Sequence, residues 1–162
     1  MSSLFFFASD QPFEEIKNPH HSFLSAKEME FLNNMKPKSK GDTIIDPLSK
    51  RKLDNGLDDD FAICPFKQPE GVRTQKKYTA RLDWPSYSKG RAVNIQEYIR
   101  KHLLETDAVE IWHIWVSEKE KPMVIKSSLK FADFTPETMK LIEEINMMTS
   151  PPTHYCYTIT KE

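Results

Sequence analysis

The chain has 162 residues, of which 38% are hydrophobic and 29% charged, and this length and composition favour a single globular domain. Its 23 basic and 24 acidic residues nearly cancel, so no long-range field attracts nucleic acid or an anionic membrane. No apolar run approaches the roughly 20 residues that span a bilayer, and Cys64 and Cys156 have no zinc or disulfide spacing. We therefore expect a cytoplasmic protein with free thiols.

The first 71 residues are expected to form an arm. The apolar run from Leu4 to Ala8 predicts a short strand that is buried on both faces. Ser25 and Glu28 have the spacing of a capping box, which predicts a helix that ends before Pro37. The irregular connection that follows contains two short strand-like pieces, 43–46 and 61–66.

Residues 72–162 show a more regular pattern. Alternation from Tyr78 to Trp84 predicts a half-buried strand, and Asn94 with Glu97 predicts the start of a helix. The β-branched and aromatic run 108–116 and the strand-like run 123–131 are joined by a short polar connection, which predicts a hairpin. Thr135 and Pro136 open a second helix with Leu141, Ile142, Ile145 and Met148 inside, and a strand over 154–160 closes the chain.

This order of strand, helix, strand, strand, helix and strand predicts an α+β fold of the ferredoxin-like, split βαβ type. Its antiparallel sheet would carry two helices on one face. We expect one domain over 1–162, in which the arm 1–71 is added to a core formed by 72–162. Since many unrelated activities share this fold, the fold alone does not indicate a function.

The two faces of the expected sheet differ in polarity. If the helices cover Leu82 and Leu129, the opposite face is polar and displays Arg81, Asp83, Lys126, Ser128, Lys130, His154, Cys156 and Thr158. The strand 108–116 is nevertheless apolar on both sides, so it needs a second covering layer, which we expect the arm to provide. Incomplete cover would leave a cleft lined by Arg81, His113, Lys126 and His154.

The sequence offers few candidates for chemistry. His113 lies between two tryptophans and is the candidate general base of a small enzyme, in which Arg81 and Lys126 would bind an anionic metabolite. His154 and Cys156 lie on one side of a strand, but no glycine-rich turn or helix start is nearby to activate the thiol. The spacing of the acidic residues and histidines predicts no metal site, and no motif indicates a cofactor.

We therefore expect a non-enzymatic protein of the bacterial accessory type, which binds or sequesters a protein partner and resembles an immunity protein in size. Its candidate binding residues are Arg81, Trp112, Trp115, Lys126 and His154. Two alternatives stay open: the small enzyme just described, and a nucleic-acid-binding protein. The latter would require a single basic stripe formed by Arg73, Lys76, Lys77, Lys126 and Lys130. A homo-oligomer with an exchanged arm is also compatible with the long connection.

Overall fold

The computed structural model describes residues 2–20, 34, 56–68, 72, 74–116, 121–145 and 151–162. Apart from the helical residue Asn34, the helix predicted after Ser25 lies outside the described residues, as does the strand-like piece 43–46. None of the helices in the described ranges has the length and apolar content needed to cross a lipid bilayer.

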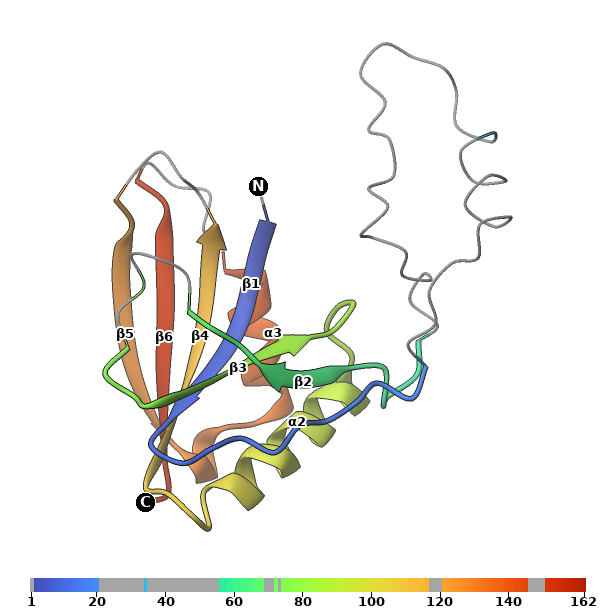
Figure 1. The fold of residues 1–162 in the computed structure, drawn as a ribbon, viewed down its shortest axis with the longest axis horizontal. Coiled ribbons are helices and arrows are strands. Elements are labelled where there is room, and N and C mark those ends of the chain that lie inside the picture. Colours follow the sequence, from blue (N-terminus) through green and yellow to red (C-terminus); the bar gives the residue numbers. More distant parts are fainter. Residues whose placement is uncertain are drawn as a thin grey trace.

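Within these residues one six-stranded sheet has the order β2-β3-β1-β4-β6-β5 (Figure 1). All neighbouring strands are antiparallel except β5 and β6, which are parallel. The helices α2 and α3 pack against the same face of the sheet. The elements are β1 (Ser2–Ser9), β2 (Ala62–Pro65), β3 (Tyr78–Asp83), α2 (Lys89–His102), β4 (Ala108–Val116), β5 (Met123–Lys130), the 3-10 helix η1 (Phe131–Asp133), α3 (Pro136–Glu144) and β6 (Thr153–Thr160).

The α+β class is as predicted, but the ferredoxin-like strand order is wrong. β1 was expected to belong to a covering arm, yet it lies in the middle of the sheet, between β3 and β4. Its phenylalanines explain this position, because Phe5, Phe6 and Phe7 are at most 6% exposed although they point to alternate faces. A strand that is apolar on both sides is most stable where both sides are covered, at the centre of the sheet.

The predicted hairpin between 108–116 and 123–131 is also wrong. β6 lies between β4 and β5, so β5 is at the edge of the sheet (Figure 1). The chain leaves β5 through η1 and α3 and returns as β6, which is the usual route to a parallel neighbour. Burial explains why β6, and not β5, is the neighbour of β4. β6 contains the buried Cys156 and Ile159, whereas almost all residues of β5 are exposed.

Both helices differ from their predicted limits. α2 begins at Lys89. The Ser88 hydroxyl caps it by accepting a hydrogen bond from the Arg91 amide at 3.2 Å, so Asn94 lies inside the helix and is not its cap. α3 has the expected Thr135 cap but ends at Glu144, and the predicted inner residue Leu141 is 64% exposed.

The sheet has a hydrophobic core on each face. The larger core lies under α2 and α3 and includes Phe5, Phe7, Leu82, Ile95, Ile99, Ile111, Met139 and Ile142. The smaller core on the opposite face, which we call the front face, contains Phe6, Ala8, Val72, Trp112, Ile114 and Cys156. The second layer required by the apolar strand β4 is therefore present, and Val72 with Phe66 contributes to it from the connection between β2 and β3.

Candidate functional site

The predicted binding residues lie on two faces of the sheet. The strand register puts Arg81, Phe6, Trp112, Cys156 and Lys126 in one row across the front face. His154 is on the same face, two residues from Cys156. The common face of Arg81, Lys126, His154 and Cys156 is thus as the alternation predicted.

Trp112 in this row is a core residue. It is 1% exposed, stacks on Phe6 with ring centroids 5.7 Å apart, and donates its indole N–H to Glu110 at 2.8 Å. The ammonium of Lys126 lies 5.7 Å from the centroid of the Trp112 ring. Trp112 therefore offers no exposed aromatic surface to a partner. Trp115 points to the helix side of β4 and is half-buried.

His113 lies on the helix side of β4, away from Arg81 and Lys126. It is 2% exposed, stacks on Phe5 with a centroid distance of 3.9 Å, and bonds through Nδ1 to the Ile142 carbonyl at 2.8 Å. Burial lowers the pKa of His113 to about 4. This geometry gives His113 a structural role and separates it from the charges that the enzyme hypothesis required in one cleft.

His154 and Cys156 do not form a reactive pair. Burial raises the pKa of the Cys156 thiol to about 12, so it stays protonated at neutral pH. Burial also lowers the pKa of His154, whose Nε2 bonds to the Trp115 carbonyl at 3.0 Å. Both cysteines are free thiols, as predicted.

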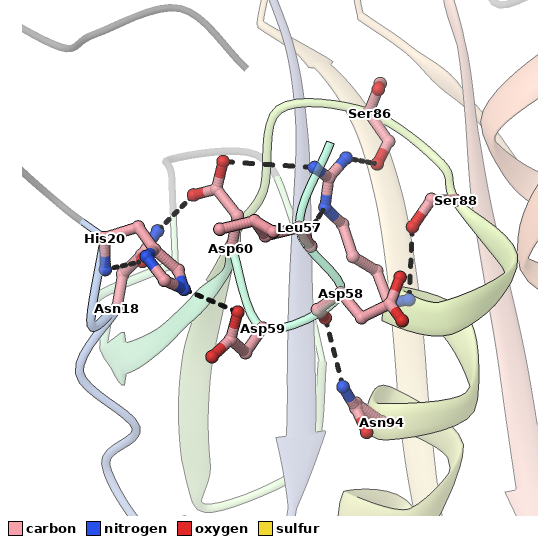
Figure 2. Close-up of polar contacts among 10 residues, drawn as sticks. Asn18, His20, Leu57, Asp58, Asp59, Asp60, Ser86, Ser88 and Asn94 are labelled. Atoms are coloured by element: carbon pink, nitrogen blue, oxygen red, sulfur yellow. Dashed lines mark hydrogen bonds and ion pairs between the residues drawn. The ribbon is translucent and has the colours of Figure 1, made fainter. Parts of the chain in front are cut away.

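The acidic loop near Gly56 is an anchoring element (Figure 2). Arg91 of α2 is 1% exposed and donates hydrogen bonds to the carbonyls of Leu57 and Ser86 at 3.0 and 3.1 Å. It also forms an ion pair with Asp60, with a nitrogen–oxygen distance of 3.9 Å. Asp60 also accepts from Asn18 at 2.5 Å, and the described residues contain no cluster suited to a metal ion. These contacts tie the loop to α2 and to the segment after β1.

Gly90 lies where this loop approaches α2. A Cβ at position 90 would lie 2.0 Å from the carboxylate carbon of Asp58. Asp58 is exposed, so its carboxylate can rotate away, and the cost of this movement should offset only part of the gain of up to about 1 kcal/mol that alanine brings to a helix. Gly90→Ala should therefore raise the free energy of unfolding, measured by urea unfolding, by less in the wild type than in an Asp58→Ala background. An equal gain in both backgrounds would contradict a steric effect of Asp58.

The described lysines are too dispersed for a basic stripe. Lys76 pairs with Asp10 at 2.6 Å beside a polar cavity of about 430 Å³, which Glu105 and Asp107 also line. Lys77 precedes β3 and Lys130 ends β5, and the three strands between β3 and β5 separate them by about 19 Å. Arg73 lies outside the described residues.

The strand β5 is exposed over almost its whole length. Seven of its eight residues are exposed, among them the consecutive Met123, Val124 and Ile125 at 51%, 41% and 39%. Val116, at the end of β4, adds another exposed side chain at 41%. The ferredoxin-like order predicted from the sequence puts this strand inside the sheet, so the edge was not expected, although Lys126 and Lys130 are residues that commonly protect an edge.

The outer edge of β5 has backbone groups available for pairing. The amide of Met123 donates to the Pro152 carbonyl at 2.9 Å, and the Leu129 carbonyl accepts from the Thr160 hydroxyl at 3.4 Å, so odd-numbered residues point toward β6. Since successive residues alternate, the amides and carbonyls of Val124, Lys126, Ser128 and Lys130 point outward. β5 has no second neighbouring strand among the described residues.

Comparison of the chain with protein-family models, with curated proteins and with solved structures gave no match.

Proposed function

We propose that this chain is a non-enzymatic protein-binding protein that takes up an extended segment of its partner along the outer edge of β5. The observation that carries the proposal is a strand that combines exposed apolar side chains with outward backbone groups that no described strand pairs. Addition of a strand to such an edge is a common mode of peptide recognition, in which the main chain provides affinity and alternate side chains provide specificity.

The remaining site geometry agrees with binding better than with catalysis. His113 faces the helices, whereas Arg81 and Lys126 lie on the front face, so a base and a charged anchor do not converge. An accessory protein that sequesters its partner, as an immunity protein does, needs only a stable exposed surface. β5 supplies such a surface, with apolar residues and two lysines along it.

The proposal is tested by closing the edge without changing the fold. Ser128→Pro removes an outward amide and leaves the bonds to β6 in place, whereas Ser128→Ala keeps that amide. In pull-downs from the native cell lysate, the wild type and Ser128→Ala should retain the same stoichiometric protein, and Ser128→Pro should lose it. Circular dichroism with thermal unfolding should show that all three are folded.

Amide hydrogen exchange identifies the edge directly. In monomers whose β5 edge is unoccupied, the amides of Val124, Lys126 and Ser128 should exchange faster than those of Ile125 and Ser127, and a strand bound along the edge should slow the first group. A partner that binds Ser128→Pro as tightly as the wild type, or that leaves these amides unprotected, would rule out strand addition at β5.

A further inference from the structure

We propose that the strand bound along β5 belongs to a second copy of this chain, with the two β5 strands antiparallel and the two-fold axis beside Ser127. The inference rests on the proposed function, since both require the outer edge of β5 to accept a strand. It names the partner and fixes the register. The result would be one continuous sheet formed by the two copies.

The side chains on the helix side of β5 have a symmetric pattern. Met123, Ile125, Ser127, Leu129 and the following Phe131 read as apolar, apolar, small, apolar, apolar in both directions. A two-fold interface requires this kind of self-complementarity. With the axis at Ser127, Ile125 of each copy lies opposite Leu129 of the other, and the two small serines meet at the centre.

Backbone geometry restricts the alternative registers. In an antiparallel pair, the outward residues of one strand must face the outward residues of the other, so the two-fold axis can pass beside a residue but not between two residues. With the axis at Lys126, the two copies of Lys126 would face each other. With the axis at Ser128, Lys126 of one copy would face Lys130 of the other. An axis at Ser127 places Lys126 opposite Ser128 and Val124 opposite Lys130, so no like charges face each other. More distant axes pair fewer residues.

This pairing would cover the apolar side chains that the isolated chain leaves exposed. Met123, Val124 and Ile125 all lie within or next to the paired segment. Lys126 and Lys130 of the two copies remain diagonal neighbours on the front face. Because salt screens charges at this separation, the dimer should become tighter as ionic strength rises.

A cysteine pair tests the register. At the axis the two residues 127 form a pair without hydrogen bonds, with Cα atoms about 4.5 Å apart, which is within disulfide range. The two residues 128 are diagonal neighbours, about 7 to 8 Å apart, and cannot be bridged without movement of the backbone. Both Ser127→Cys and Ser128→Cys are made in a Cys64→Ser background, since Cys64 is the half-exposed native thiol.

Under mild oxidation, Ser127→Cys should give at least roughly tenfold more covalent dimer than Ser128→Cys. Light scattering should show a dimer for the wild type and Ser128→Ala, and a monomer for Ser128→Pro. Equal or reversed cross-linking would overturn the register, and a dimer that survives Ser128→Pro would overturn the inference. A monomeric wild type whose lysate partner still depends on the amide of residue 128 would overturn the inference and leave the proposed function standing.

Discussion

Replacement of Trp112 by alanine should lower the free energy of unfolding by about 4 kcal/mol. The side chain is 1% exposed in the front core, stacked on Phe6 and bonded to Glu110, which also accepts from the Thr74 hydroxyl at 2.5 Å. Alanine would leave a large cavity and remove the indole donor from a half-buried carboxylate. Urea unfolding at neutral pH, followed by circular dichroism, measures the loss.

Trp112→Phe is the matched control. It keeps an aromatic ring beside Phe6 and loses mainly the N–H bond to Glu110, so it should cost about 1 to 2 kcal/mol. A loss of stability below about 1 kcal/mol for Trp112→Ala would show that Trp112 is not buried in the core on the front face, and it would restore Trp112 as a candidate binding residue. Because Trp112→Ala acts on the fold, a loss of partner binding in that variant would not identify a binding surface, and Ser128→Pro is the better probe.

Local patterns in the sequence predicted most of the strands. The run 108–116 coincides with β4, and the alternation in Tyr78 to Trp84 correctly separates the buried Leu82 from the exposed Arg81. The prediction succeeded because successive side chains of a strand point to opposite faces, so the apolar residues of each strand indicate which face is buried. The common face of Arg81, Lys126 and His154 follows from the same alternation.

The order of the strands could not be obtained in this way. Alternation within β4 shows that His113 and Trp112 face opposite sides, but it does not show which side the helices cover. Nor does a short connection after β4 show that the next strand pairs with it, since β6 returns from far along the chain to separate them. The polar residues of β5, including Ser127 and Ser128, are in retrospect the signal for an edge.

The start of α2 shows how a weaker local signal was overlooked. Ser88 caps the helix, but Gly90 in the first turn weakens the helical pattern, and Asn94 with Glu97 offers an apparent cap six residues after Ser88. In the folded protein the carboxylate of Asp58, from a distant loop, lies in the space that a side chain at position 90 would enter. This contact between distant segments cannot be predicted from the local sequence.

Acidification should destabilise the protein by about 3 kcal/mol through His113 alone. Its Nδ1 must carry the proton, because a carbonyl accepts the bond, while the buried Nε2 has no partner among the described residues. Protonation of Nε2 therefore places an unpaired charge in the larger core, which is why the pKa of His113 is lowered to about 4 from an ordinary value near 6.5.

The direction of the effect follows from the two pKa values of His113, folded and unfolded. Above pH 6.5 neither state carries the proton, and the stabilisation is complete. Between about pH 6.5 and 4 the unfolded chain takes up a proton that the folded chain does not, so the free energy of unfolding decreases as the pH falls. Below about pH 4 both states are protonated at His113, and its contribution levels off. The lowered pKa values of His102 and His154 act in the same direction.

His113→Asn isolates the contribution of this residue. Asparagine can present an N–H near the position of Nδ1 to the Ile142 carbonyl but does not titrate, so the variant should be less stable at pH 7 and should lose less stability on acidification. Urea unfolding between pH 4 and pH 7.5 gives both slopes. A variant whose stability falls as steeply as that of the wild type would show that His113 does not remain neutral in the folded protein. A shallower slope would support the structural role of His113 and weigh further against its action as a general base near neutral pH.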